Sequence, residues 1–418
     1  MLVQFTVGNF LSFNQKRTLN LEAKGISELK TNIATFKAEK VLRSAVVYGA
    51  NSSGKSNLIK AFERMREVVL SSVRLNDSDE LDYSPFLLST ETENQPTFFE
   101  IVFWQYATRY RYGFEYNSNQ IINEWLFAGK SEKTFYIRTA EGIGVDSKFK
   151  EGEGNEAKTN NNRLFVSLVA QLGGDISKKI LEFFKEFNVL SGLEHNDYTG
   201  FTTKMLHKNL NGCNESFALY QKLKLGFQDI KAIESDFNPL DILDDIPEKL
   251  KAKLIKEFTG KRGVSLKTIH NKFDNKGRII DFVLFDKEKN ESEGTNKIID
   301  LSGPIFDTLK LGKTLIIDEL DAKLHPLITM RIVEFFNNPE SNPNNAQLIF
   351  ATHDTNLLGE ELFRRDQIWF TEKDEQEQTD LYSLYDFNLP DGSKVRNDSN
   401  LERNYIRGRY GAIPFITN

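Results

Sequence analysis

The chain has 418 residues, a formal net charge of −6, an apolar fraction of 39% and a charged fraction of 27%. This composition is typical of a soluble globular protein and predicts two or three domains. No apolar stretch approaches the roughly 20 residues that span a bilayer, and Met1–Phe5 lacks the features of a signal peptide. The single cysteine, Cys213, excludes an internal disulfide, so we expect a cytoplasmic protein with no membrane contact. The negative charge argues against a general nucleic-acid coat protein but leaves a local basic groove open.

The first strong motif is the octapeptide Gly49–Ser56, GANSSGKS, which matches the P-loop pattern G-x-x-x-x-G-K-[ST]. The apolar run before it, residues 44–48, predicts a buried strand, and the apolar spacing of residues 57–65 predicts a helix. Strand, loop and helix are the context that this motif requires. The pattern therefore predicts a site for ATP, and this context disfavours the alternative of a chance glycine-rich turn.

Each residue type in the loop has a physical role. Gly49 and Gly54 let the backbone curl, so that its N–H groups point at phosphate oxygens, and the helix adds its positive N-terminal end. Lys55 can reach the β- and γ-phosphates, and the Ser56 hydroxyl can ligate Mg²⁺. The other predicted nucleotide contacts are Asn51, Ser52, Ser53 and Asn57.

Beyond the P-loop helix, residues 97–104, 110–116 and 121–127 are rich in strand formers and predict an antiparallel meander. Their aromatic side chains favour sheet packing over platforms for base stacking. Residues 148–162 are polar and predict a loop. Residues 163–258 then turn to helical spacing, and because no heptads are sustained, we expect a short helical insertion rather than a coiled coil.

Strand patterns return at residues 264–269 and 279–285. We therefore expect an α/β fold in three parts. Residues 1–140 would form the N-terminal half of a nucleotide-binding head, residues 141–260 a helical insertion or lid, and residues 261–418 the C-terminal half of the head.

The second half of a P-loop site is an acidic residue at the end of another apolar strand. Residues 314–317, TLII, suit a central parallel strand and are followed by Asp318 and Glu319. Asp318 would hold Mg²⁺ directly or through water, and Glu319 could act as the general base for the attacking water. An ordinary strand with a charged end is the alternative, and the P-loop already present reduces its weight.

A third element follows. Residues 346–352 predict a buried strand, and His353 comes directly after it. A side chain at the carboxyl end of a strand in an open α/β sheet faces the ligand crevice. His353 could therefore hydrogen-bond a γ-phosphate as a catalytic switch, although a histidine taken alone would favour a structural role.

These three elements, in this order, resemble the ATPases of the ATP-binding-cassette type, in the branch of the SMC and Rad50 heads. The chain more closely resembles the bacterial AAA15 or OLD-like ATPases of anti-phage defence systems. Phe5–Phe13 is similar to the opening strand and "NF-x-S-F" turn of that group, Asp318–Pro326 to its "DELD-x-x-LHP" pattern, and Arg403–Phe415 to its "Y-x-x-GRYGA-x-P" ending. The resemblance covers nearly the whole chain, least securely at residues 140–260, and His325 takes the place of the usual D-loop aspartate.

The resemblance implies a signature motif upstream of the acidic pair. Ser292–Thr295, SEGT, is similar to the group's "S-x-G-T" and opens a predicted helix from about Thr295 to Lys310. Ser292, Gly294 and Thr295 would then contact the γ-phosphate held by a second subunit. A plain helix cap fits the same residues. Leu301–Pro304 is a rival candidate, but it lies inside the predicted helix.

The resemblance also implies the wider function. The fold would be a cassette-type P-loop head, a mixed sheet with flanking antiparallel strands, that binds ATP and Mg²⁺ and assembles as a homodimer or higher assembly. Such an ATPase would sense a phage protein or DNA trigger and control a separately encoded effector, often a nuclease, as in the RloA, PtuA and PARIS relatives. A Rad50-like or SMC-like ATPase of DNA repair or maintenance, and a nucleotide-locked scaffold, are the alternatives.

Overall fold

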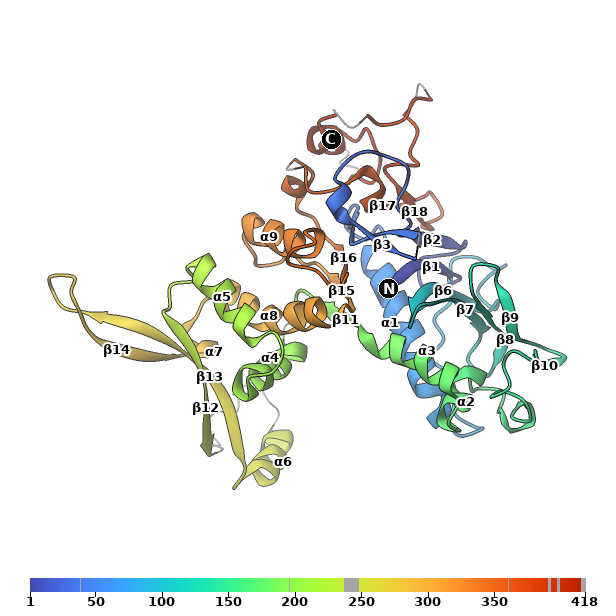
Figure 1. Cartoon of the computed structure of the whole chain (residues 1–418), viewed down its shortest axis with the longest axis horizontal. Coiled ribbons are helices and arrows are strands. Elements are labelled where there is room, and N and C mark those ends of the chain that lie inside the picture. Colours follow the sequence, from blue (N-terminus) through green and yellow to red (C-terminus); the bar gives the residue numbers. More distant parts are fainter. Residues whose placement is uncertain are drawn as a thin grey trace. The chain divides into compact units, whose positions relative to one another are not determined.

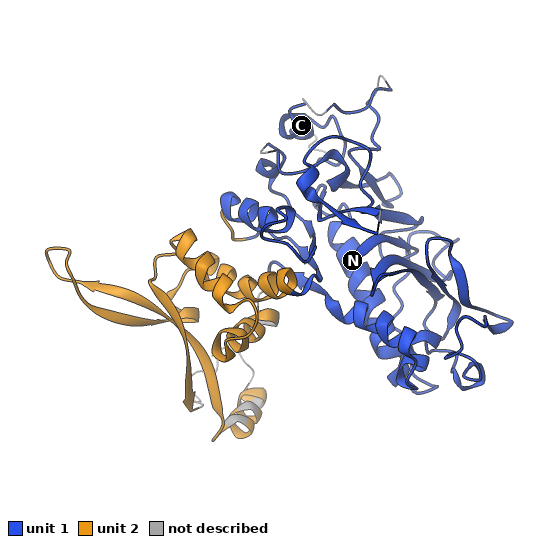
Figure 2. Cartoon of the chain, viewed as in Figure 1, with its two compact units in different colours: residues 1–193, 311–322, 326–418 blue, residues 194–310, 323–325 orange. Residues whose placement is uncertain are grey.

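The computed structural model describes residues 1–37, 39–194, 196–236, 248–359, 361–389, 392–396 and 399–414. The chain divides into two compact units (Figure 2). Unit 1 comprises residues 1–193, 311–322 and 326–418, and unit 2 comprises residues 194–310 and 323–325. The sequence predicted boundaries near residues 140 and 260, whereas the two compact units meet near residues 193 and 310.

Unit 1 contains a seven-stranded antiparallel sheet in the order β10-β9-β8-β7-β6-β1-β2. The strands are β1 (Leu2–Gly8), β2 (Arg17–Asn20), β6 (Thr97–Gln105), β7 (Thr108–Tyr116), β8 (Ile121–Ala128), β9 (Lys133–Thr139) and β10 (Gly142–Val145). The predicted meander, β6 to β8, is confirmed. Phe99 packs edge-on against Phe114 across β6 and β7, so aromatic side chains here serve sheet packing.

The second sheet of unit 1 has six strands in the order β11-β15-β16-β5-β17-β18 (Figure 1). The strands are β5 (Ser44–Tyr48), β11 (Phe187–Ser191), β15 (Thr314–Asp318), β16 (Gln347–Ala351), β17 (Ile368–Lys373) and β18 (Thr379–Ser383). Its pairs are parallel except for β17 with β18. The predicted mixed α/β sheet with flanking antiparallel strands is therefore confirmed.

The helices of unit 1 are α1 (Lys55–Ser71), α2 (Phe165–Gln171), α3 (Asp175–Glu186), α9 (Pro326–Asn337) and α10 (Leu401–Ile406). One buried cluster joins side chains of both sheets with α1, α2 and α3. Within it, Phe62 of α1 stacks on Phe5 of β1 at 3.7 Å between ring centroids and meets the edge of Phe187 of β11. The helix that follows the P-loop is thus held between the two sheets. A small pair, β3 (Ile33–Phe36) and β4 (Glu39–Leu42), completes the strands of this unit.

Unit 2 combines helices with an antiparallel sheet in the order β12-β13-β14. Its elements are α4 (Asn196–Lys208), α5 (Cys213–Leu223), β12 (Asp229–Asp236), α6 (Glu248–Phe258), β13 (Arg262–Phe273), β14 (Ile279–Asp286), α7 (Lys287–Asn290) and α8 (Glu293–Leu311). Tyr220, Ile230, Leu266 and Ile299 form its core cluster. None of the helices in the described ranges has both the length and the apolar character needed to cross a bilayer.

The expectation of helix throughout residues 163–258 is wrong in two places. Phe187–Ser191 forms β11, whose pairing with β15 supplies the backbone hydrogen bonds that a helix would otherwise supply. Asp229–Asp236 forms β12, which pairs along its full length with β13. The predicted strands at residues 264–269 and 279–285 exist as β13 and β14, but they belong to unit 2 and not to the sheets of the head.

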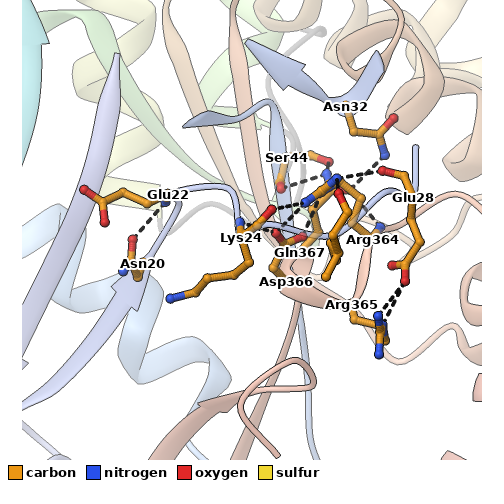
Figure 3. Close-up of polar contacts among 11 residues, drawn as sticks. Asn20, Glu22, Lys24, Glu28, Asn32, Ser44, Arg364, Arg365, Asp366 and Gln367 are labelled. Carbon is orange, nitrogen blue, oxygen red and sulfur yellow. Dashed lines mark hydrogen bonds and ion pairs between the residues drawn. The ribbon is translucent and has the colours of Figure 1, made fainter. Parts of the chain in front are cut away.

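A buried arginine ties the N-terminal segment of unit 1 to its C-terminal half (Figure 3). Arg364 is fully buried, and its guanidinium donates to both carboxylate oxygens of Asp366 at 2.8–2.9 Å. It also donates to the backbone carbonyl oxygens of Lys24 and Glu28, at 3.0 Å and 2.6 Å. Asp366 in turn accepts the backbone N–H of Lys24 at 2.7 Å. Every contact joins groups more than 330 positions apart except the one between Arg364 and Asp366.

We expect Arg364→Met to destabilise unit 1 by about 3–5 kcal/mol, because it leaves the Asp366 carboxylate buried without its cation. Arg331→Met is the matched control. The Arg331–Glu334 pair of unit 1 is exposed, with 46% and 45% of the side chains accessible, so its loss should cost about 1 kcal/mol or less. Urea unfolding followed by circular dichroism measures both. Equal losses for the two variants would contradict the importance of the buried pair.

Candidate functional site

The P-loop occupies the turn between β5 and α1, as predicted. All five residues of β5 are buried, and α1 begins at Lys55. Gly54 is the N-cap of this helix, with φ +113°, and Ser52 also has a positive φ, +63°. These angles turn successive backbone N–H groups toward one side of the loop, which is the arrangement that cradles anions.

The loop also has no room for side chains at its two glycines. A Cβ on Gly49 would lie 2.4 Å from Ser53 Oγ and 2.5 Å from the carbonyl oxygen of Thr371. A Cβ on Gly54 would lie 2.3 Å from Thr379 Oγ1. Strands β17 and β18 therefore pack closely against one side of the loop. Only glycine fits at these two positions, and a ligand can approach the loop from its other side.

We expect Gly54→Ala to impair nucleotide binding and to lower the melting temperature, because it adds a steric clash to an unfavourable φ. Gly129→Ala is the control for the backbone alone, since Gly129 has φ +79° and open space around its Cβ position. Thermal unfolding and nucleotide titration compare the two variants. Equal melting temperatures would show that the contact with Thr379 is unimportant.

Lys55 lies at the start of α1 with its side chain folded over the loop. Its Nζ donates to the carbonyl oxygens of Gly49 at 2.8 Å and Ala50 at 3.0 Å. Desolvation lowers the pKa of Lys55, while Asp318, Glu319 and other nearby carboxylates oppose that shift. The electrostatic interaction between the buried ammonium and these acids shows that the P-loop lies close to the end of β15.

The acidic pair lies where the sequence predicted, at the end of β15. One oxygen of Asp318, Oδ1, is buried without a hydrogen-bond partner among the described residues. Oxygen ligands of this kind suit Mg²⁺, which takes one or two carboxylates together with phosphate oxygens and water. The donor set therefore fits the ion, with Asp318 and the Ser56 hydroxyl as the groups that would hold it. Glu319 follows with φ +52°.

A cavity of about 470 Å³ gathers most of the predicted residues. Its lining comprises residues 51–57, Glu319, His353 and Lys373. Gly49 lines a neighbouring cavity of about 560 Å³, which also includes Asn51 and His353. The structure thus brings the loop, the second acidic residue and the histidine to one place.

His353 lies just after β16, and two hydrogen bonds hold the backbone of the next residue, Asp354. The Asp354 N–H donates to Thr352 Oγ1 at 3.0 Å, and the Tyr48 hydroxyl donates to the Asp354 carbonyl at 3.0 Å. Desolvation and the charge of Lys55 lower the pKa of His353. The imidazole is therefore neutral at neutral pH, with one nitrogen able to donate and the other able to accept.

Several groups that hold the site were missed at the level of sequence. Thr379 Oγ1 donates to the Ser53 carbonyl at 2.9 Å and, with its proton used there, accepts from Ser12 Oγ at 2.7 Å. The Asn57 amide donates to the same Ser12 oxygen at 2.7 Å. Ser12 lies in the "NF-x-S-F" turn, so that motif was visible, but its task of bracing the P-loop was not. Lys373, the second lysine of the cavity, carried no local signal.

The segment predicted as a signature, Ser292–Thr295, lies in unit 2 at the start of α8. Ser292 Oγ accepts the Thr295 backbone N–H at 3.1 Å, which is the geometry of a helix N-cap. A Cβ on Gly294 would lie 2.9 Å from the Lys323 carbonyl oxygen. Contact with a second subunit stays a prediction. The rival Leu301–Pro304 is buried within α8, as expected for the interior of a helix.

The fold and the loop define a P-loop nucleotide-binding domain. Residues 44–359 match the protein-family model described as "AAA domain, putative AbiEii toxin, Type IV TA system". Because this match spans well over half of the chain, the chain belongs to that family of AAA-type ATPase domains. Comparison with curated proteins gives no match.

Solved structures with similar folds include three SMC heads. An SMC head bound to the C-terminal winged-helix domain of ScpA has 16% identity and a TM-score of 0.42, and the match covers 91% of this chain and 97% of that one. The Thermotoga maritima SMC head has 12% identity and a TM-score of 0.41, covering 91% and 98%. A Pyrococcus furiosus SMC head bound to the C-terminal domain of ScpA has 13% and 0.39, covering 91% and 96%.

Proposed function

We propose that the chain binds MgATP on its P-loop and hydrolyses it with the acidic residues at the end of β15. The observation that carries this proposal is the unpartnered, buried Oδ1 of Asp318, coupled electrostatically to the ammonium of Lys55. A buried carboxylate oxygen without a hydrogen-bond partner is stabilised by a cation, and a desolvated ammonium is stabilised by an anion. The Mg²⁺ complex of a nucleoside triphosphate meets both.

Each side chain then has a definite task. Lys55 and the loop N–H groups hold the β- and γ-phosphates, while Asp318 and Ser56 would hold the ion, which supplies charge neutralisation. Glu319, in the cavity wall, accepts a proton from the attacking water. Neutral His353 donates a hydrogen bond to the γ-phosphate.

Phosphate release from the purified chain tests this proposal. We expect hydrolysis that requires Mg²⁺ and stops when EDTA is added. A chain that binds no nucleotide at millimolar concentration would overturn the assignment. Hydrolysis that rises strongly with bare DNA would favour the Rad50-like alternative, and nucleotide that copurifies without turnover would favour the locked scaffold.

We further propose that the active site is shared between two copies, with Ser292–Thr295 of one closing the P-loop of the other. Ser292 is exposed at the start of a 19-residue helix, whose first N–H groups can bind an anion. Gly294→Asp should spare ATP binding to the single chain and prevent ATP-dependent dimerisation, because its carboxylate repels the opposing γ-phosphate. Mass measurement with and without ATP tests this.

Gly294→Ala is the control, since it adds the same Cβ beside the Lys323 carbonyl without the charge. Mixing Gly294→Asp with Lys55→Ala chains should restore about one working site per heterodimer. In that pair, the Lys55→Ala chain offers its intact Ser292–Thr295 segment to the intact P-loop of its partner. A mixture as inactive as its parents, with no ATP-dependent change in mass, would return the segment to a helix cap.

At the level of the cell, we infer that the chain is an AAA15 or OLD-like ATPase of an anti-phage defence system, which senses a phage or DNA trigger and restrains a separately encoded effector. The three segments that resemble this group support the inference, and so does the family description, which names a putative AbiEii toxin of a Type IV TA system. Expression of the neighbouring genes with and without this chain, under phage challenge, tests it. Equal growth and equal plaque counts would contradict it.

A further inference from the structure

Strand β14 in unit 2 exposes a row of large apolar side chains. Five of its eight residues are large apolar side chains with between 36% and 62% of their surface accessible. They are Ile279, Ile280, Phe282, Leu284 and Phe285. Phe273 on the paired strand β13 adds a further exposed ring, at 57%. Side chains alternate between the two faces of a strand, so these residues are divided between both faces of the sheet. So many exposed large apolar side chains on one strand mark an interaction site on a soluble protein.

The same strand is an edge of its sheet. β14 pairs with β13 on one side, and no strand of the described part of the chain pairs with its other side. Natural edges are usually protected by charged side chains, proline or bulges. Ile279–Asp286, IIDFVLFD, contains neither lysine nor proline, and its protection is limited to Asp281, Asp286 and one bulge at Ile280.

The Phe282 N–H donates to Asp281 Oδ1 at 2.8 Å and the Asp286 N–H to Asn290 Oδ1 at 2.8 Å. A strand that pairs with this edge therefore has to replace these two side-chain acceptors with its own carbonyl oxygens.

We propose that β14 pairs antiparallel with β14 of a second copy, joining two three-stranded sheets across a two-fold axis at Phe282. An isologous contact of this kind closes on itself and gives a dimer rather than a fibre. It needs no nucleotide and does not rest on the proposed ATPase function. The ATP-dependent change in mass that the shared active site predicts is therefore measured in a Phe282→Glu background, in which the contact through β14 is removed.

The sequence of the strand selects this register. A two-fold axis perpendicular to the sheet leaves each side chain on the same face of the joined sheet. Even-numbered residues of one copy therefore lie opposite even-numbered residues of the other, and odd-numbered opposite odd-numbered. With the axis at Phe282, Asp281 faces the partner's Val283, and the regular alternation extends outward as far as Asp281. Ile280 is the extra residue of a bulge between Ile279 and Asp281, so it lies beside the partner's Leu284 without forming a regular pair.

The neighbouring registers are worse. An axis at Asp281 would place two carboxylates face to face, and an axis at Val283 would place Ile280 against the partner's Asp286.

The exposed apolar area sets an upper bound on the contact. Taking roughly 200 Å² for a fully exposed large apolar side chain, the exposed side chains of β14 amount to roughly 500 Å² per copy. Edge-to-edge pairing covers the flanks of these side chains and leaves their faces in solvent, so the dimer would be a small interface, below the usual size of specific ones. Backbone hydrogen bonds along the strand add direction to this apolar contact.

Sedimentation of the nucleotide-free chain at micromolar concentration tests the proposal, with a dimer expected. Phe282→Glu places two carboxylates opposite each other on the axis and should yield a monomer. Leu172→Glu is the control, because Leu172 in unit 1 is 54% exposed and should leave the dimer intact. A monomeric parent, or a Phe282→Glu variant that stays dimeric, overturns the proposal.

Disulfide formation gives a second readout that does not depend on the charged variant folding. Phe282→Cys lies opposite itself across the axis, at about 5 Å between Cβ atoms, within reach of a disulfide. A cysteine at position 284 lies four residues along the strand from the same position in the partner, which separates the two sulfur-bearing residues by roughly 14 Å. With diamide, we expect Phe282→Cys to form covalent dimers much faster than Leu284→Cys. Equal rates would overturn the register and the proposal with it.

Discussion

Lys55→Ala is expected to abolish the binding of MgATP. The Lys55 ammonium is the point charge at the open side of the P-loop, held there by the carbonyl oxygens of Gly49 and Ala50. Lys373, the other lysine of the cavity, is engaged by Glu377 at 3.4 Å and lies at the end of β17 rather than at the start of α1, so we do not expect it to replace Lys55. Isothermal titration calorimetry with MgATP measures the loss.

Lys60→Ala is the matched control, because Lys60 is an exposed lysine on the same helix. It should bind nucleotide as the parent does. Since desolvation already disfavours the charged form of Lys55, removing its side chain should leave the fold intact, and circular dichroism checks this. A Lys55→Ala chain that binds MgATP as tightly as the parent would show that the P-loop assignment is wrong.

Glu319→Gln is expected to retain ATP binding and to slow hydrolysis by ~10²-fold or more, the usual scale for the loss of a general base. The amide keeps the size of the side chain but cannot accept a proton from water. Because the bound nucleotide then persists, the variant should also trap the ATP-bound assembly. Phosphate release and particle mass in the presence of ATP measure the two effects.

Glu340→Gln, at an exposed position away from the cavity, is the control for loss of a carboxylate. It should hydrolyse ATP at the parental rate. Unchanged turnover in Glu319→Gln would remove Glu319 from the catalytic role and leave the acidic end of β15 to metal binding alone.

The parts of the site that could be predicted are those whose functional residues all lie within a short stretch of sequence. The P-loop needs two glycines, a lysine and a hydroxyl within eight residues, and both flanking elements follow from apolar spacing. The acidic end of β15 and the position of His353 after β16 rest on equally local patterns. Such short motifs keep the same local structure in the folded chain because their conformation does not depend on residues distant in sequence.

The parts that could not be predicted depend on distant partners. Thr379 braces Ser53 from 326 positions away, and no local pattern marks a threonine for that task. Phe187–Ser191 carries apolar residues that suit either a helix or a strand, and β15, which is distant in sequence, decides for the strand. Two of the three strands of unit 2, β13 and β14, were visible in the sequence, but they were assigned to the C-terminal half of the head, and β12 was expected to be helical.

The order of strands in the second sheet also bears on how the protein is made. β5, which carries the P-loop, lies between β16 and β17, and both of these neighbours come late in the chain. At 5–20 residues per second, a ribosome needs roughly 15 to 60 s to supply them. During that time the nascent chain holds a central apolar strand with both edges open, a state prone to aggregation. A message truncated before β17 would therefore yield no partial ATPase, only a chain that needs a chaperone or a protease.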